Sequence, residues 1–296
     1  MKMNKYVLAL ALASMALAGC DKVESLPSEE PGVISLRTSV GEYTKASGLD
    51  FNVGDVFGLY ILERKGTSAP SFGGEYYAEN LMCTKTESGI DMVRTYYSEN
   101  KLDFYAYYPY SGNGTVYSAP ECISHNISSE QNEKVYFDKC DFMKASVKEV
   151  VASDQPVKLE FSHMMALCEV QLLPGTGMTV NDLKFATLLV KKVPLSCKVN
   201  LVTGAVSRGM ISGNITPYGN RVSIQGDKVS QMSFISVPTK VKKGAELFEI
   251  SIKERKFHYY LENDLELKSG YKYKFEITLN AAAQAPASVR VLEMPR

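Results

Sequence analysis

The stretch Tyr271-Lys272-Tyr273-Lys274-Phe275-Glu276-Ile277-Thr278-Leu279 decides the fold class, because its odd-numbered residues are apolar and its even-numbered residues are polar. Successive side chains of a β-strand point to opposite faces, so this alternation predicts a strand with one buried face and one solvated face. Ser269-Gly270 marks a turn just before it, and residues 257–261 form a candidate strand on the other side of that turn.

Outward from this stretch the chain is a succession of short strands, and no long helical period appears. Residues 56–62 are apolar on both faces, as expected for a central strand. Gly54-Asp55 supplies a turn before that strand, and we expect the Asp55 side chain to cap the turn. Only residues 141–145 look moderately helical. The sequence therefore predicts an all-β fold, for which paired β-sandwiches are the simplest packing.

Residues 157–173 form the most informative strand, because the buried face changes along it. Lys158 places charge on the even-numbered face, whereas Glu169 places charge on the odd-numbered face. One strand cannot change face without slipping by an odd number of residues, so we expect a bulge or a sheet-to-sheet crossing near residues 164–165. His163 lies at that joint, where we interpret it as a buried packing residue.

The first 19 residues have the layout of a secretory signal peptide. Lys2 and Lys5 precede an apolar run that is shorter than the roughly 20 residues needed to cross a bilayer. Gly19-Cys20 ends this segment in the pattern of a bacterial lipobox. We therefore expect cleavage between Gly19 and Cys20, lipidation of Cys20, and a location outside the cytoplasm. The alternative is an ordinary signal peptide that happens to contain a cysteine.

Composition beyond the signal peptide indicates a tether followed by two domains. Residues 20–31 are rich in acidic residues and proline and offer little to bury, so we expect them to stay flexible. About 265 residues remain, a length typical of two domains. The polar run Ser153-Asp154-Gln155-Pro156 marks a boundary between a first domain at 32–155 and a second at 156–296.

Charge and cysteine usage narrow the class of protein. Without Lys2 and Lys5, 31 basic residues face 33 acidic ones, and this net charge of −2 provides no basic excess for binding nucleic acid. The five cysteines beyond Cys20 are an odd number without paired spacing, which is a poor disulfide framework, so most should be small buried residues, and a single bridge stays open. These cysteines are Cys83, Cys122, Cys140, Cys168 and Cys197.

The sequence carries no recognisable catalytic or metal-binding constellation. Its three histidines, His125, His163 and His258, have no spacing that would place two of them on one metal ion. It also lacks a nucleophile elbow, a P-loop and a dinucleotide fingerprint, so we expect no cofactor and no enzyme activity. Paired carboxylates for glycoside hydrolysis need only proximity in space and stay an open alternative.

Several segments follow one another in an informative order after the lipobox. In the first half they are Thr44-Lys45-Ala46, Phe51-x-x-Gly54-Asp55-x-Phe57-Gly58-x-Tyr60 and Phe104-x-Ala106-Tyr107-Tyr108-Pro109. In the second half they are Asp141-Phe142-Met143-x-Ala145, Phe161-x-His163-x-x-Ala166 and Gly270-Tyr271-x-Tyr273-x-Phe275-x-Ile277-x-Leu279. Together they resemble the fimbrillin-like proteins of Bacteroidales, the subunits of type V pili. The resemblance spans nearly the whole mature chain.

This resemblance implies two transthyretin-like β-sandwich domains in tandem, export as an outer-membrane lipoprotein, and assembly with other subunits into surface fibres. In polymerising members of the family, a trypsin-like protease cuts after a basic residue near the first strand. A strand of another subunit then fills the exposed groove, whose free backbone groups it satisfies. Lys45 is the first candidate for processing, although a lysine there disfavours an arginine-specific protease, and Arg37 is the second.

Residues 281–296 hold the candidate donor strand. If extended, Val289 to Met294 span on the order of 20 Å, which is long enough to lie along one edge of a sheet. This strand has two possible destinations, its own domain or the groove of a neighbouring subunit, and the resemblance favours the neighbour. The alternative function is a surface lipoprotein that binds a glycan or a host ligand and never polymerises. The apolar residues of the candidate donor strand are Val289, Val291, Leu292 and Met294.

Overall fold

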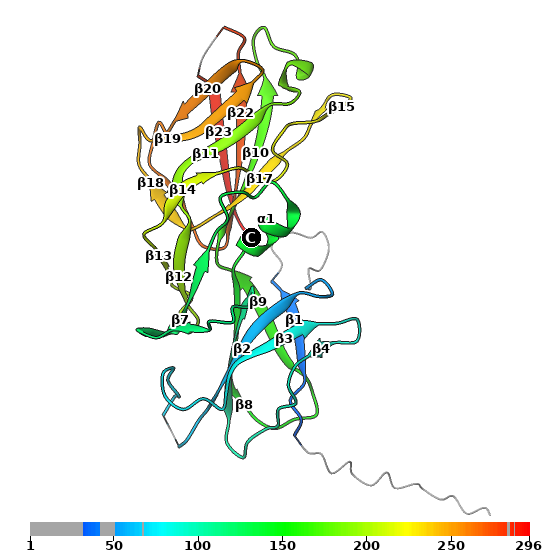
Figure 1. The fold of residues 1–296 in the computed structure, drawn as a ribbon, viewed down its shortest axis with the longest axis vertical. Coiled ribbons are helices and arrows are strands. Elements are labelled where there is room, and N and C mark those ends of the chain that lie inside the picture. The colour runs from blue at the N-terminus through cyan, green and yellow to red at the C-terminus, as the bar shows by residue number, and fades with distance from the viewer. Residues whose placement is uncertain (1–31, 42–50, 67, 283–284, 287) are drawn as a thin grey trace, which may run out of the picture. The chain divides into compact units, whose positions relative to one another are not determined.

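The computed structural model describes residues 32–41, 51–66, 68–282, 285–286 and 288–296. The chain divides into two units, Met1–Pro31 and Gly32–Arg296, and every described residue belongs to the second. The regular secondary structure of this second unit is almost entirely β-strand, which confirms the all-β prediction (Figure 1). Among the described residues, no helix is long and apolar enough to cross a membrane.

One sheet has seven strands in the order β1-β9-β8-β5-β2-β3-β4. Its strands are Leu36–Val40 (β1), Val56–Glu63 (β2), Ala78–Lys85 (β3), Ile90–Asp91 (β4), Leu102–Tyr108 (β5), Met143–Val150 (β8) and Val157–His163 (β9). β1 runs parallel to β9, whereas the other neighbours are antiparallel. β2 lies between β3 and β5 and is buried from Phe57 to Leu62, so the predicted central strand is confirmed.

The inner face of the seven-stranded sheet encloses a hydrophobic core. Phe161 of β9 packs edge to face on Phe57 of β2 with ring centroids 5.5 Å apart, although two strands separate β9 from β2 in the sheet. Phe51 lies just before β2 and contacts both rings, at 4.8 Å from Phe161 and 5.7 Å from Phe57. The sheet therefore curls until β2 and β9 face each other.

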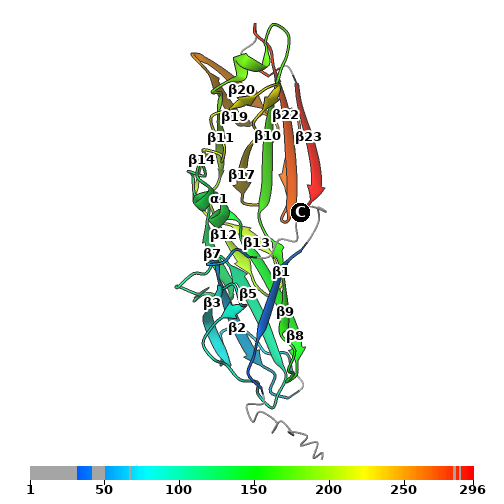
Figure 2. The same ribbon diagram turned by 90° about the vertical axis from the view of Figure 1, so that its right-hand side faces the viewer.

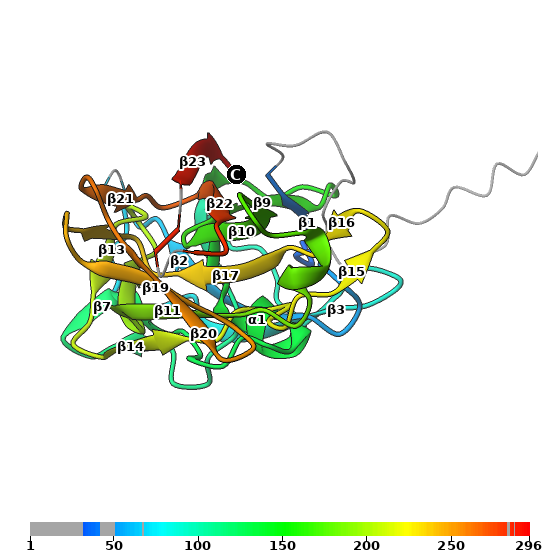
Figure 3. The ribbon, with the colours of Figure 1, turned by 90° about the horizontal axis from the view of Figure 1, so that it is seen from above.

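Two four-stranded sheets form a β-sandwich around a second core. The first has the order β17-β10-β22-β23, and the second has the order β14-β11-β19-β20 (Figures 2 and 3). Phe248 of β19 meets Phe275 of β22 at 5.1 Å and Phe234 of β17 at 6.2 Å, so the two sheets pack face to face. The strands are Ala166–Pro174 (β10), Thr187–Pro194 (β11), Ser212–Ile215 (β14), Met232–Ser236 (β17), Glu246–Ile252 (β19), Arg255–Tyr260 (β20), Tyr271–Leu279 (β22) and Ser288–Pro295 (β23).

A third four-stranded sheet, in the order β13-β12-β7-β6, joins segments from both halves of the sequence. Its strands are Thr115–Val116 (β6), Ala119–Asn126 (β7), Ser196–Asn200 (β12) and Val206–Arg208 (β13). Two short pairs complete the strands: Ile224–Gln225 (β15) with Lys228–Val229 (β16), and Thr239–Val241 (β18) with Leu265–Leu267 (β21). The described helical segments are the α-helix Lys134–Cys140 (α1) and the 3-10 helix Val180–Leu183 (η1).

The change of buried face after residue 163 is a crossing between sheets, as predicted. β9 exposes its even-numbered residues and lies in the seven-stranded sheet, whereas β10 lies between β17 and β22 in the sandwich. The strand predicted at 271–279 is confirmed as β22, which alternates between half-buried and buried residues from Lys272 to Leu279. It forms the ladder next to β10, parallel to it and in register from Leu167 opposite Lys272 to Pro174 opposite Leu279.

The prediction of a helical segment at residues 141–145 is wrong. α1 ends at Cys140, and the segment from Met143 belongs to β8. Met143 and Ala145 are both buried and lie opposite Tyr108 and Ala106 of β5. A burial period of two residues, set by the core of the seven-stranded sheet, therefore outweighs the local helical composition.

The division into domains at residue 155 stays a prediction. β9 follows that point in the sequence, yet it pairs with β1 and β8. The crossing that leads from the first core to the second lies at the β9–β10 joint, Met164-Met165. The cysteines of the described chain are free thiols, and Cys83, Cys140, Cys168 and Cys197 are buried, as most of them were predicted to be.

Candidate functional site

The predicted site residues fall into three groups. Gly19, Cys20 and Lys45 lie outside the described residues. Arg37 lies within β1, where it is exposed and in register with Lys158 of β9. The candidate donor residues all lie in β23, described below.

β1 is an edge strand with one buried face. Leu36, Thr38 and Val40 are at least nine-tenths buried, whereas the alternate residues Arg37 and Ser39 are exposed. Among the described strands, β9 is its one sheet neighbour. Removing β1 would therefore uncover both a backbone edge along β9 and an apolar groove that leads into the first core.

β23 is also an edge strand, and it lies along β22 of its own sheet, antiparallel to it. Val289 is opposite Ile277, and Met294 is opposite Lys272. No residue of β23 is fully buried, and Val291 remains 36% exposed. The strand thus has a complete backbone ladder with β22 but few apolar contacts, as its weak apolar pattern suggests.

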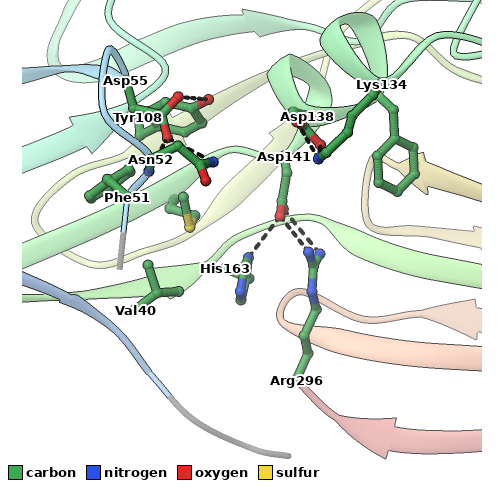
Figure 4. A pocket seen from close by; sticks show the side chains of 12 residues that line it. Val40, Phe51, Asn52, Asp55, Tyr108, Lys134, Asp138, Asp141, His163 and Arg296 are labelled. Carbon is green, nitrogen blue, oxygen red and sulfur yellow. Dashed lines mark hydrogen bonds and ion pairs between the residues drawn. The ribbon is translucent and has the colours of Figure 1, made fainter. Parts of the chain in front are cut away.

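The ends of these strands meet at a pocket of about 190 Å³ (Figure 4). Val40 at the end of β1 lines it, as do His163 at the end of β9 and Arg296 just after β23. Asp141, between α1 and β8, extends its carboxylate toward the last two side chains. Four segments that are distant in sequence therefore line one pocket, and two of them contact the buried carboxylate of Asp141.

Asp141 accepts two hydrogen bonds from the Arg296 guanidinium, 3.1 Å from Nη1 to Oδ1 and 2.5 Å from Nη2 to Oδ2. His163 Nδ1 lies 2.9 Å from Asp141 Oδ2, a close polar contact without the geometry of a regular hydrogen bond. Burial by itself raises the pKa of the Asp141 carboxyl, but the charge of Arg296 and the contact with His163 hold that pKa below its usual value. The carboxylate is therefore ionised and held from two sides.

The turn before β22 secures the same region. Gly270 adopts a φ of +71°, and a Cβ on it would lie 3.0 Å from the carbonyl oxygen of His163, so both conformation and space favour glycine. The Arg296 N–H donates to the Gly270 carbonyl at 2.8 Å, and the Ser269 hydroxyl donates to the Met164 carbonyl at 2.9 Å. The β9–β10 joint, this turn and the end of β23 thus form one hydrogen-bonded junction.

The opposite wall of the pocket belongs to the segment before β2. The Asn52 N–H donates to Asp55 Oδ2 at 2.8 Å, which confirms that Asp55 caps the turn. Lys134 and Asp138 of α1 also line the pocket and bind each other on one face of the helix at 2.6 Å. These polar groups are paired within their own segments, whereas the Asp141 cluster connects segments that are distant in sequence.

A second group of ligand-type side chains lies on the neighbouring strands β19 and β20. Ligand atoms of Glu246, Glu249 and His258 lie within 4.8 Å of one another. His258 Nδ1 is 2.7 Å from Glu246, and both oxygens of Glu249 are taken by Lys256 at 2.7 Å and Lys191 at 3.1 Å. The hydrogen bonds from Lys256 and Lys191 lower the Glu249 pKa to about 2. These two cations already neutralise the carboxylate that a metal ion would need.

Sequence reasoning found His163 but missed both of its partners. His163 is buried, as predicted, and it also faces a carboxylate. Asp141 lies in the segment that the sequence predicts to be helical. Arg296 follows a strand for which the sequence does not predict a single pairing partner. The sequence feature closest to the cluster was the change of buried face at the β9–β10 joint. Where a chain passes from one sheet to another, backbone polar groups leave their ladder and need other partners.

The sequence model of the fimbrillin-like family matches residues 44–292 of this chain. None of the curated proteins matches it. Among solved structures, a candidate cell adhesion protein from Bacteroides ovatus has a TM-score of 0.67 at 18% identity, over 89% of this chain and 96% of the other. One from Bacteroides uniformis has a TM-score of 0.60 at 19% identity, over 91% and 98%. A fimbrial protein from Bacteroides vulgatus has a TM-score of 0.58 at 14% identity, over 89% and 99%. At these identities the likeness shows a shared fold.

Proposed function

Because this chain belongs to the fimbrillin-like family, we propose that it is a structural and adhesive subunit of a type V-like pilus on the cell surface. The family and the fold are those of fimbrial and adhesion proteins rather than of enzymes. Other pilus subunits are then its partners, in a polymer of one or several kinds of subunit.

The observation that carries this proposal is the pair of edge strands. β1 buries one face in the first core while pairing only with β9 among the described strands, so its removal would leave a groove of strand length. β23 pairs along β22 but buries no residue fully, so it has little buried side-chain surface to hold it on its sheet. A strand that left one subunit and entered the groove of the next would restore the backbone ladder there.

Processing would create that groove. We propose Lys45 as the first site, because a cut there leaves β1 intact as a departing strand. A cut at Arg37 would fall within β1, where the backbone is engaged with β9. Arg37 is nevertheless exposed and remains the second candidate.

One observation favours the alternative, a surface lipoprotein that binds a glycan or a host ligand without polymerising. β23 is paired within its own sheet from Thr278 opposite Ser288 to Tyr271 opposite Pro295, and a subunit that kept this pairing would donate no strand. Both functions share the fold and the location at the surface, and they differ in whether β23 leaves.

Electron microscopy of cells with and without the gene tests the proposal. Fibres that disappear with the gene and return on complementation are the expected result. Unchanged fibres, together with surface display of a monomer, would support the non-polymerising alternative instead.

Anchoring to the outer membrane through lipid on Cys20 is part of the proposal. Cys20→Ala should abolish incorporation of labelled palmitate and leave the protein unprocessed or released. Cys122→Ala is a matched control, because it removes another cysteine, half-exposed in the folded unit, and should leave palmitate incorporation unchanged. Equal labelling of the Cys20→Ala variant and the wild type would contradict the anchor.

A further inference from the structure

The Asp141 cluster joins the end of the candidate donor strand to the end of the strand on which β1 lies. Arg296 follows β23 and reaches Asp141 with both ends of its guanidinium. His163 is the last residue of β9, the strand on which β1 lies, and its Nδ1 faces the same carboxylate at 2.9 Å. One carboxylate thus contacts the end of the candidate donor strand and the end of the strand that borders the candidate groove.

The end of β1 lies at the same pocket as this cluster. Val40, the last residue of β1, lines the pocket and is 7% exposed (Figure 4). Its position is fixed by the register of Val40 opposite Phe161 and by the hydrogen bond from the Gly41 N–H to the Phe161 carbonyl, at 2.9 Å. Departure of β1 would remove this apolar wall and admit solvent to the carboxylate.

The other side-chain ion pairs of β23 are exposed to solvent. Arg290 binds Glu276 at 3.0 Å with 66% of the arginine side chain exposed, and Glu293 binds Lys268 with both side chains more than one-third exposed. Ion pairs of this kind contribute little in water. The contact between Arg296 and Asp141 is the one in which both side chains are more than four-fifths buried.

We infer that Asp141 couples the presence of β1 to the retention of β23. With β1 in place, the Arg296–Asp141 pair lies in a medium of low effective dielectric constant and holds the end of β23 on its own domain. Once β1 leaves, water weakens the pair, because the attraction between two charges falls as the surrounding dielectric constant rises. The donor strand is then released in a subunit whose own groove has just opened. This inference rests on the proposed strand exchange.

Backbone hydrogen exchange in the monomer tests the coupling without requiring polymerisation. Four variants are compared with the wild type: Val40→Ala, Asp141→Asn, the double variant, and the control Arg290→Gln. The readout is the exchange rate of the β23 amides, because local opening of an edge strand sets that rate. Val40→Ala should speed exchange several-fold and Asp141→Asn about tenfold or more. The double variant should exchange no faster than Asp141→Asn, and Arg290→Gln should match the wild type within about twofold.

Effects that multiply in the double variant, or a Val40→Ala variant that leaves β23 unchanged, would overturn the coupling. A second measurement repeats the assay after trypsin-like treatment, with Lys45→Ala as the matched control. The coupling predicts that processing speeds the exchange of the β23 amides in the wild type. It predicts no such increase in the Lys45→Ala variant, which is not processed, or in the Asp141→Asn variant, whose β23 already exchanges fast before processing. If the coupling holds but processed subunits never polymerise, the proposed function fails while this inference stands.

Discussion

Arg296 and Asp141, 155 positions apart in the sequence, form a bidentate ion pair at the junction where β9 passes into β10. The pair brings the end of β23 to the same buried carboxylate that His163 faces. The end of an edge strand is ordinarily the part of a sheet that frays first. Here it is fixed by the strongest kind of side-chain hydrogen bond, a planar guanidinium on a carboxylate.

Arg296→Ala should destabilise the folded unit by about 2–4 kcal/mol, because it leaves the buried Asp141 carboxylate without its main counter-charge. Urea unfolding followed by circular dichroism measures the change. Arg290→Ala is the matched control, since it removes an arginine from the same strand whose ion pair is exposed, and it should cost less than about 1 kcal/mol. Equal losses in the two variants would show that the contact with Asp141 adds nothing.

Acid should weaken the fold through Asp141. Its folded pKa is lower than its unfolded pKa, so the ionised carboxylate stabilises the fold above the ordinary aspartate pKa of about 4, and this contribution is lost as the pH falls through the folded pKa. The free energy of unfolding of Asp141→Asn should therefore lie below the wild-type value at pH 7, and the gap should narrow below about pH 4. A gap that stayed constant from pH 7 to pH 2 would contradict this assignment.

Phe161→Ala should cost about 3–5 kcal/mol, because the ring fills the first core between Phe51 and Phe57. Phe185→Ala provides the control, since its ring is 55% exposed and is covered mainly by Arg221, 4.7 Å from the ring centroid. We expect this control to lose less than about 1 kcal/mol. Thermal or urea unfolding of both variants gives the comparison, and similar losses would contradict the curled sheet.

The five described cysteines should react unequally with a maleimide in the native state. Burial raises the thiol pKa of Cys140 to about 11 and of both Cys83 and Cys197 to about 12, and it also raises the pKa of Cys168. Only Cys122 is half-exposed, and its pKa is raised as well, mainly by partial burial. Mass spectrometry should therefore find slow labelling at Cys122 and protection of the other four until urea is added. Early native-state labelling of Cys168 would contradict the packing of β10.

The sequence predicted what depends on neighbouring residues and missed what depends on distant ones. The alternation in residues 271–279 and the change of face near residue 164 identified β22 and the crossing from β9 to β10, because burial in a strand follows a period of two. The helix α1 was missed, since seven residues give too short a pattern to separate from loop composition. The partner of β23 also could not be predicted, because an edge strand with a weak apolar face fits more than one sheet.

The candidate site shows the same division. His163 could be placed at a joint and predicted to be buried from its position in the strand. Its partner Asp141 follows α1, and Arg296 lies beyond the final strand, so only the folded chain brings the three together. A charge that is satisfied across sheets leaves no periodic signal in the sequence.

The central claim is that β23 of one subunit replaces the β1 of another, and a ladder assay on purified protein tests it most directly. The protein is treated with a trypsin-like protease, concentrated, heated in detergent and separated on a gel. We predict heat-resistant ladders from the wild type, and only monomer from Lys45→Ala and from a variant lacking residues 288–296. Ladders that persist after residues 288–296 are removed would contradict the account.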